Sequence, residues 1–372
     1  MLYLISFAFT LFLFRAVFMF LGQYKSKKVK YIIPETNELP SISVIVPARN
    51  EENNIIRCID ALMKSDYPND KFEVIVVNDR STDNTGNIIE LYAGKYQNLK
   101  AVHVADEKQS LNLRGKPGAL QHGINKAKGE YLMMTDADCA VNPNWIKSIA
   151  GTFITHKLNL IPAFTLIQGE RKFDKIQQVE WIYMHTMASA GIAFNQPLGC
   201  YGNNLSIKKD VYEKIGGYEN IKFSVTEDLA LLQAVHRKFG GVHYLCDKDS
   251  AVTTLPENTL IDYIKQHRRW AVGGLDLGLR AGIFVASSVG IWLAFILSLI
   301  SGFYMLAAGV FIFRVVSDSS MILYSMKKLE LPSRSYFWLV PSVIFFMLME
   351  LVIPTLIIDK EIKWKGQTFK KT

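Results

Sequence analysis

The sequence predicts a membrane protein that carries an α/β domain with a mostly parallel, doubly wound sheet. Two observations support this prediction. Apolar runs at both ends of the 372-residue chain are long enough to cross a hydrocarbon core of ~30 Å. Between them, residues 41–280 alternate β-branched apolar strands with helical stretches, and polar residues follow the strands. The chain is therefore expected to hold a water-soluble domain at a membrane.

The first apolar run, residues 1–23, is expected to be an uncleaved transmembrane anchor. It has no basic region before it and no small-residue cleavage site, which argues against a secretory signal peptide. Lysines follow it in the linker 24–40, so the next domain is expected in the cytoplasm. Arg15 lies inside the run, and we expect it to snorkel or to face a neighbouring span.

The domain over residues 41–258 begins with strands that alternate with helices. The expected strands are 41–48, 72–77, 99–104 and 131–135, and helices are expected over 55–64 and 118–127. Polar residues at the end of each strand favour a parallel sheet with a ligand site at that edge.

Beyond residue 138 the pattern is less regular. A further strand is expected over 160–168, an apolar helix over 177–194, and a helix running toward the membrane over 258–280. The last of these overlaps a juxtamembrane segment, 259–282, that carries a cluster of basic and aromatic residues. The apolar helix suits a platform at the membrane surface or an ordinary core helix.

The C-terminal part is expected to be a transmembrane region, 283–358, with two or three segments, followed by a basic tail, 359–372. Three spans would leave the lysines of the tail outside, against the positive-inside tendency. One segment is therefore expected to be re-entrant or interfacial, and Pro341 and Pro354 make the last one the candidate. Arg314 and Asp318, one helical turn apart, are expected to pair.

Composition argues against several other classes of protein. The 42 Lys and Arg residues exceed the 34 Asp and Glu residues, but the lysines cluster at the ends of apolar runs, so nucleic acid is not expected as a partner. The four cysteines have no zinc-site spacing and are expected to be reduced thiols. No G-x-G-x-x-G, H-E-x-x-H or G-x-S-x-G motif supports an oxidoreductase, a zincin or a serine hydrolase.

Acidic residues follow two of the expected strands. Asp136 and Asp138 come directly after the strand 131–135, where two carboxylates can share a divalent cation with phosphate oxygens. Asp79 ends a neighbouring strand and suits either a nucleoside contact or the cap of the next helix. Taken alone, each also suits an ordinary solvated loop.

Three further motifs can carry chemistry. The R-G-K-P-G loop at 114–118 precedes a helix and suits a phosphate, although it is not a Walker A motif. T-E-D at 226–228 is either the acidic first turn of a helix or the site of a general base. Q-H-R-R-W at 266–270 is either a basic collar or a place where an arginine neutralises a leaving diphosphate and Trp270 stacks on a sugar.

In this order, the motifs resemble those of the family 2 glycosyltransferases, which use nucleotide sugars and have the Rossmann-like GT-A fold. The resemblance covers residues 41 to 272. Its motifs are Pro47-Ala48-Arg49-Asn50-Glu51, Asp79 with Ser81 and Asp83, Gly115-Lys116 with Ala119-Leu120, Asp136 and Asp138, Gly202-x-Asn204, Thr226-Glu227-Asp228 and Gln266-x-x-Arg269-Trp270.

The resemblance implies an inverting transfer of a hexose-type sugar from a nucleotide sugar, a UDP-sugar in the first instance, with Asp228 as the base. Donor-binding residues would be Pro47, Arg49, Glu51, Asp79, Lys116 and Asp136. Asp138, with Asp136, would hold Mg²⁺ or Mn²⁺ on the diphosphate. The acceptor and diphosphate side would comprise Gln266, Arg269, Trp270, Glu227 and Asn204. Members of the family often have an acidic pair or a small residue where this chain has Asn78-Asp79-Arg80, so the base of the donor stays open.

The modest membrane region favours a membrane lipid or lipid-linked acceptor and a multi-pass protein of the cell membrane with a cytoplasmic catalytic domain. A processive polysaccharide synthase that extends and exports a β-linked glycan is the alternative. Readings of other classes are a non-catalytic nucleotide-sugar-binding scaffold, and a phosphatase that uses D-x-D. Phosphatases of that kind place the pair on their first strand, whereas three expected strands precede it here.

Overall fold

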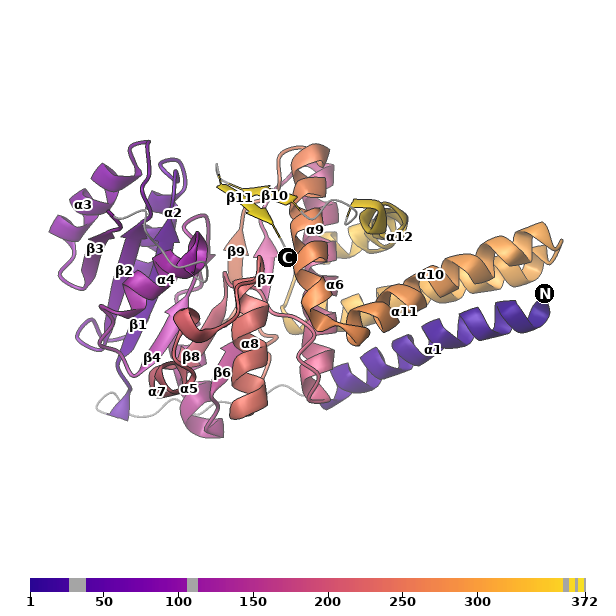
Figure 1. Cartoon of the computed structure of the whole chain (residues 1–372), viewed down its shortest axis with the longest axis horizontal. Coiled ribbons are helices and arrows are strands. Elements are labelled where there is room, and N and C mark those ends of the chain that lie inside the picture. Colours follow the sequence, from indigo (N-terminus) through magenta and orange to yellow (C-terminus); the bar gives the residue numbers. More distant parts are fainter. Residues whose placement is uncertain (27–37, 106–112, 357–360, 365–366, 371–372) are drawn as a thin grey trace.

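The computed structural model describes residues 1–26, 38–105, 113–356, 361–364 and 367–370. Residues 27–37 of the expected basic linker, and part of the basic tail, lie outside this range. The soluble domain is built on a six-stranded sheet in the order β3-β2-β1-β4-β8-β6 (Figure 1). Its strands are β1 (Ile42–Ala48), β2 (Phe72–Asn78), β3 (Leu99–His103), β4 (Tyr131–Met134), β6 (Leu160–Pro162) and β8 (Leu205–Lys208).

Strands β1 to β4 are parallel, whereas β8 is antiparallel to β4 and β6 is antiparallel to β8. The expected mostly parallel, doubly wound sheet is confirmed, with one reversed strand, β8, next to the edge strand β6, which runs in the same direction as β4. From β1 the chain builds outward through β2 and β3, and then crosses to β4 on the other side of β1. The carboxyl ends of β1 and β4 thus flank a switch point, where open α/β sheets bind their ligands.

Helices cover both faces of the sheet. One face packs on α2 (Ile55–Met63), α3 (Thr85–Lys95) and α5 (Trp145–His156), and the other on α4 (Lys116–Ile124), α7 (Lys209–Ile215) and α8 (Glu227–Lys238). Successive residues of a strand point to opposite faces, so Val44 and Val46 join the first core and Ile45 the second. The uninterrupted apolar strands follow from burial on both sides.

The expected strand over 160–168 is divided between two sheets. Its first part is β6, and its second part is β7 (Thr165–Ile167) of a small sheet with the order β5-β9-β7, which includes β5 (Ala140–Val141) and β9 (Val252–Thr254). Between them, the Ala163 and Phe164 N–H groups donate to the carbonyls of Asn204 and Leu245. The apolar run is continuous in the sequence, so the sequence does not indicate where the chain passes from one sheet to the other.

Four described helices are long and apolar enough to cross a membrane. They are α1 (Leu2–Lys25), α10 (Leu279–Ile300), α11 (Tyr304–Lys328) and α12 (Leu339–Leu356), the last preceded by the 3₁₀ helix η5 (Ser333–Trp338). In Figure 1, α1, α10 and α11 extend together away from the soluble domain, whereas α12 is seen nearly end-on. The short strands β10 (Glu361–Trp364) and β11 (Gln367–Lys370) form a hairpin beside the soluble domain (Figure 1).

Helices α6 (Lys172–Ala193) and α9 (Leu260–Gly274) lie where the soluble domain meets the membrane helices (Figure 1). The helix expected over 258–280 is interrupted: α9 ends at Gly274, the 3₁₀ turn η4 (Leu275–Leu277) follows, and α10 starts after Gly278. Gly278 has φ +59°, a left-handed conformation that ends a helix and suits glycine.

The junction between α6 and α1 is unusually close. A Cβ atom on Gly22 would lie 2.5 Å from the Ala190 carbonyl oxygen, so only glycine fits there without a shift. Ser26 and Ser189 share a hydrogen bond of 3.0 Å between their hydroxyls. The apolar core on the face of the sheet covered by α4, α7 and α8 also continues into α11 and α12. The soluble domain and the membrane helices therefore share one core.

A charged cluster connects the membrane helices. Arg15 donates to the Ser288 hydroxyl at 2.6 Å and to the Tyr183 hydroxyl of α6. Arg314 pairs with Asp318 at 2.6 Å, as expected, and with Glu350 of α12 at 3.0 Å. Arg15 thus faces its neighbours rather than the lipid headgroups. Buried opposite charges compensate one another here, as the cost of charge in an apolar medium requires.

Candidate active site

A pocket of about 580 Å³ opens at the carboxyl ends of β1, β2 and β4. The register of the sheet aligns Ala48 with Asn78, so the residues that follow these strands meet at one edge. Residues from α4, α6, α8 and α9 complete the wall. All the expected site residues except Asn204 line this pocket: Pro47, Arg49, Glu51, Asp79, Lys116, Asp136, Asp138, Glu227, Asp228, Gln266, Arg269 and Trp270.

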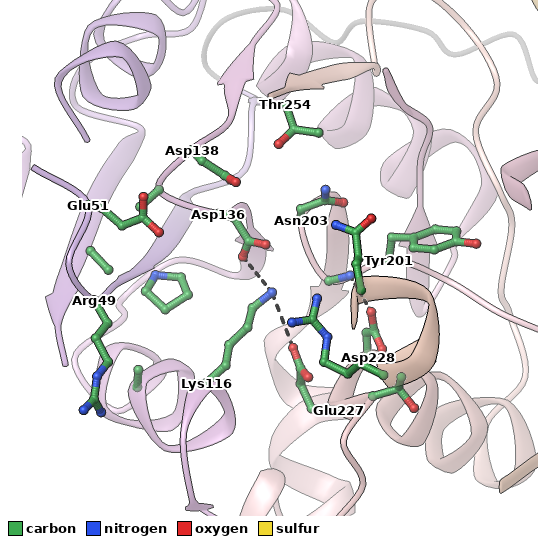
Figure 2. Close-up of a pocket in the computed structure, with 18 of the residues that line it drawn as sticks. Arg49, Glu51, Lys116, Asp136, Asp138, Tyr201, Asn203, Glu227, Asp228 and Thr254 are labelled. Atoms are coloured by element: carbon green, nitrogen blue, oxygen red, sulfur yellow. Dashed lines mark hydrogen bonds and ion pairs between the residues drawn. The ribbon is translucent and has the colours of Figure 1, made fainter. Parts of the chain in front are cut away.

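Lys116 lies between two acidic residues in the centre of the pocket (Figure 2). Its Nζ is 2.6 Å from Asp136 Oδ1 and 3.4 Å from Glu227 Oε1. Gly115, with φ +72°, caps α4, so Lys116 starts the helix. Although burial opposes the charge, Asp136, Glu227 and Asp228 hold the pKa of Lys116 above its usual value. The lysine is therefore a fixed cation that joins the β4 edge to α8.

Asp228 is held by two backbone groups. The Gly202 N–H donates to its Oδ2 and the Leu229 N–H to its Oδ1, both at 2.7 Å. Burial and the charge of Glu227 raise the pKa of Asp228 to about 7, against the opposing effect of Lys116. A carboxylate with such a pKa is well matched to accept a proton near neutral pH.

The loops that follow β1 and β2 are tied together on the nucleotide side expected from the sequence. The Asn50 N–H donates to Ser81 Oγ at 3.0 Å, and the Thr82 N–H donates to Asn50 Oδ1 at 2.8 Å. Asp79, which is buried, accepts from Arg80 Nε at 2.8 Å and lies 3.7 Å from Arg49. These contacts give the loops one joint conformation at the pocket edge.

Asp138 lines the pocket beyond Asp136, and Figure 2 places it toward Thr254. Its backbone carbonyl accepts from Arg57 Nη1 at 2.9 Å, which fixes the loop after β4. Within the described ranges, no three His, Cys, Asp or Glu side chains gather at a distance that could hold a metal ion. A cation at Asp138 would therefore need oxygens from a bound ligand, as Mg²⁺ often takes from phosphates.

Aromatic side chains form the opposite wall. Trp270 of α9 and Trp181 of α6 meet edge to face with centroids 5.5 Å apart, and Tyr201 lies 5.9 Å from Trp270. Gln266 donates to Glu257 Oε1 at 2.8 Å. Of these, Trp181, Tyr201 and Glu257 were not expected in the site. The sequence of this apolar helix gave no sign that its tryptophan, Trp181, faced a cavity.

Asn204 lies outside the pocket, in the core behind it. Its amide donates to the carbonyls of Phe164 and Ser250 at 2.8 and 2.9 Å, and its Oδ1 accepts from Trp145 Nε1 at 3.0 Å. The side chain is fully buried, and these hydrogen bonds give it a structural role in holding neighbouring loops together. Its neighbour Asn203 lines the pocket instead.

Helix α9 is fixed to α6 by a buried polar group. His267 Nε2 is 3.1 Å from Glu180 Oε1, which also accepts from the Tyr263 hydroxyl at 2.6 Å. Burial opposes protonation, but the Glu180 carboxylate raises the pKa of His267 above its usual value. This contact sets the position from which Gln266, Arg269 and Trp270 reach the pocket.

The end of α9 also touches the T-E-D segment. A Cβ on Gly273 would lie 2.3 Å from Thr226 Cγ2, whereas a Cβ on Gly274 would meet no heavy atom within 4 Å. Beside this contact, Ser224 Oγ donates to Asp276 Oδ2 at 2.6 Å. The start of the membrane region is thereby in contact with the loop that presents Glu227 and Asp228.

Comparisons with known proteins show the family to which the chain belongs. A family model described as "Glycosyl transferase family 2" matches residues 43–216, and one described as "Glycosyl transferase family group 2" matches residues 131–353. The chain therefore belongs to the family 2 glycosyltransferases, as the order of its motifs predicted.

Similar curated proteins are glycosyltransferases. A probable glycosyltransferase, YdaM of Bacillus subtilis, is 28% identical over 65% of this chain and 57% of its own length. Glycosyltransferase AglE of Haloferax volcanii is 30% identical over 50% of this chain and 58% of its own length. A β-monoglucosyldiacylglycerol synthase of Nostoc is 27% identical over 63% of this chain and 49% of its own length. The chain thus spans about half the length of the curated relatives it matches.

A solved structure shares the fold. The mannosyltransferase PcManGT of Pyrobaculum calidifontis, solved in complex with GDP-Man and Mn²⁺, superposes with a TM-score of 0.58 at 19% identity, over 94% of this chain and 99% of that one. The chain has the GT-A fold with apolar helices toward both ends, as predicted.

The Gly273 contact yields a first prediction. Gly273→Ala should lower the rate of glycosyl transfer about 10- to 100-fold, because the added methyl must displace Thr226 and a shift of ~1 Å at a reacting group costs this much. Gly274→Ala, one residue along the same helix, should leave the rate within about two-fold. Initial rates and unfolding temperatures of both variants check this. Equal rates with an unchanged Gly273→Ala fold would show that the contact does not position T-E-D.

Proposed function

We propose that the chain is an inverting glycosyltransferase that moves a hexose-type sugar from a UDP-sugar to a hydroxyl of a membrane lipid or lipid-linked acceptor. The observation that carries this proposal is the placement of Asp228. Its carboxylate faces one cavity together with Lys116 and Asp136 on the strand side and Trp270 on the helix side. Asp228 accepts the proton of the acceptor hydroxyl as the oxygen forms its bond to the anomeric carbon. The diphosphate departs from the opposite face of the sugar, which inverts the anomeric configuration.

The donor occupies the strand side of the pocket. Asp79 and the joined loops after β1 and β2 surround the nucleoside, with Pro47, Arg49 and Glu51 at its edge. Lys116 and Asp136 lie where the diphosphate and sugar would follow. Arg269 lines the same cavity and offsets charge on the leaving diphosphate. Glu227, close to Lys116, lies between the donor and acceptor sides.

The oxygen donors of the pocket fit Mg²⁺ or Mn²⁺. Asp138 supplies a hard carboxylate at the strand edge, and the diphosphate of the donor supplies the further oxygens that a six-coordinate ion takes. Asp136 is less suited to the same ion, because Lys116 already holds its Oδ1. When bound, the cation neutralises charge on the leaving diphosphate.

The acceptor approaches along the aromatic wall. Trp181, Tyr201 and Trp270 present ring faces and edges to the cavity, and Gln266 lies on the same side. Trp181 and Trp270 belong to α6 and α9, which lie against the membrane helices (Figure 1). A lipid headgroup therefore has a short path from the bilayer to Asp228. The similarity to a β-monoglucosyldiacylglycerol synthase favours a lipid acceptor.

The chain would be an integral membrane protein with its catalytic domain in the cytoplasm. Lys25 ends α1, and Lys327 and Lys328 end α11, next to the soluble domain. Their positions follow the positive-inside tendency for a cytoplasmic domain.

A transfer assay tests the proposed reaction. Membranes containing the protein are incubated with radiolabelled UDP- and GDP-sugars, Mn²⁺ or Mg²⁺, and total lipid extract, and the products are separated by solvent partition and gel filtration. Label in a small organic-soluble product is expected with a UDP-sugar. Asp228→Asn should lower this label about 10²- to 10⁴-fold, the range for loss of a general base. Label only in large water-soluble material would overturn the lipid acceptor, and full activity of Asp228→Asn would overturn the assignment of the base.

The raised pKa of Asp228 predicts a pH dependence. The base acts in its deprotonated form, so kcat/KM should rise up to tenfold per pH unit below about pH 7 and level off above it. Glu227→Gln removes a charge that raises this pKa, and should move the midpoint to lower pH. Rates at saturating metal from pH 5 to 9 measure both curves. A flat profile in the unmodified protein would contradict the role of Asp228.

The proposed cation site predicts a loss of binding. Asp138→Ala should remove the gain in UDP-sugar affinity that Mn²⁺ provides, because it removes the carboxylate that would hold the ion. Titration calorimetry with and without Mn²⁺ measures this gain without turnover. Asp66→Ala, which removes an exposed aspartate paired with Lys147, is the control and should keep the full gain. An equal gain in both variants would exclude Asp138 as a ligand.

A further inference from the structure

Helix α12 differs from the other long apolar helices in its direction. Figure 1 looks nearly along its axis, while α1, α10 and α11 run together across the picture. Helix α12 packs on α6 and α11 and also on α9. Helices that cross a bilayer tilt from its normal by at most about 40°, whereas α12 lies across the common direction of α1, α10 and α11 (Figure 1).

Contacts along α12 keep it beside the soluble domain. Just before it, Arg334 lies 3.9 Å from Glu170, which precedes α6. Within it, the ring of Phe345 packs on Phe173 of α6 and on Tyr263 of α9, with centroids 6.0 and 5.7 Å apart. Tyr263 lies in the first turn of α9 and belongs to the same helix as the Q-x-x-R-W motif. The middle of α12 therefore remains at the level of the domain surface.

The exposed face of α12 is apolar. Its large exposed apolar side chains lie mostly three or four residues apart, which places them on one side of the helix. They are Val340, Ile344, Leu348, Leu351 and Val352, and Phe337 of η5 continues the row. Ser342 is buried on the other side of the helix, where Glu350 meets Arg314 and Arg15. Thr355, in the last turn, is exposed, and its hydroxyl donates to the Val352 carbonyl within the helix. This arrangement is inverted relative to a surface helix in water, and it fits an apolar surrounding.

We infer that α12 lies in the plane of the bilayer, within the leaflet next to the catalytic domain, with this apolar row against the acyl chains. Helix α10 likewise exposes apolar side chains, which include Ile283, Val289 and Ile296. Glu350 fastens the helix to α1 and α11 through Arg15 and Arg314. The chain then crosses the bilayer three times.

This placement also accounts for the charge of the tail. With three crossings, the segment after α12 emerges on the side of the catalytic domain, where Figure 1 places the hairpin of β10 and β11. Lys363 and Lys370 of this hairpin, which four crossings would have put outside, are then inside. The inference does not depend on the donor or the acceptor of the reaction.

Depth measurements test this placement. Single cysteines replace Val340, Ile344, Leu348 or Leu351, carry a nitrobenzoxadiazole label, and are quenched by lipids with nitroxides at defined acyl positions in vesicles. The four positions span 11 residues, about 16 Å of helix. An in-plane helix gives one common depth for all four, and a crossing helix gives depths that increase along the series.

Helix α10 supplies the matched control. Labels at Ile283, Val289 and Ile296, which span 13 residues or about 20 Å, should give graded depths in the same vesicles. The background carries Cys246→Ala, because the other three cysteines are buried, and it should take up no label. Graded depths on α12 would overturn the inference. Absence of quenching at all four positions would also overturn it, since water or a second copy of the chain would then cover the row.

The side of the C-terminus gives an independent measurement. A protease site and tag added after Thr372 should be cleaved, in sealed vesicles, from the side on which the catalytic domain is also accessible. Cleavage only from the opposite side would mean a fourth crossing and would overturn the inference.

Discussion

The close packing of α6 against α1 is the constraint on which the rest of this molecule depends. Gly22 allows the backbones to approach so closely that a methyl group would meet the Ala190 carbonyl at 2.5 Å. From this junction α6 presents Trp181 to the pocket and Tyr183 to Arg15 of the membrane cluster. One helix thus sets the distance between the aromatic wall of the pocket and the apolar helices, and α9 takes its own position from α6 through Glu180 and His267.

The electrostatics of the pocket follow from crowding like charges around one lysine. Asp136, Glu227 and Asp228 all act on Lys116, and only part of this negative charge is neutralised. Burial is the largest cause of the raised pKa of Asp228, the charge of Glu227 adds to it, and Lys116 opposes both. The surroundings of Asp228 thereby bring the pKa of its carboxyl group near neutrality, and two backbone N–H groups fix its orientation.

Much of this arrangement could be predicted from the sequence. The features that could not be predicted depend on tertiary contacts that leave no local sequence pattern. Strand ends in a parallel sheet converge, so Asp79, Asp136 and the loop after β1 were expected at one edge, where they lie. Asn204 was expected in the site, but its side chain makes three hydrogen bonds in the core. The adjacent Asn203 lines the cavity instead. Such a difference depends on which way one turn faces, and no local pattern encodes it. Likewise, the apolar run 160–168 cannot reveal that its two halves join different sheets.

The shared core has a consequence for how this enzyme can change or be handled. Met321 and Met326 of α11 and Val343 and Phe346 of α12 are buried in the same apolar cluster as the strands β1 and β4. Removing the membrane helices would strip one face of the sheet and leave that cluster open to water. The catalytic domain and the membrane helices are therefore not interchangeable modules. A substitution that changes the volume of a core side chain in one of them requires a compensating change in the other. Over evolutionary time the two are expected to be inherited, duplicated and lost as one unit.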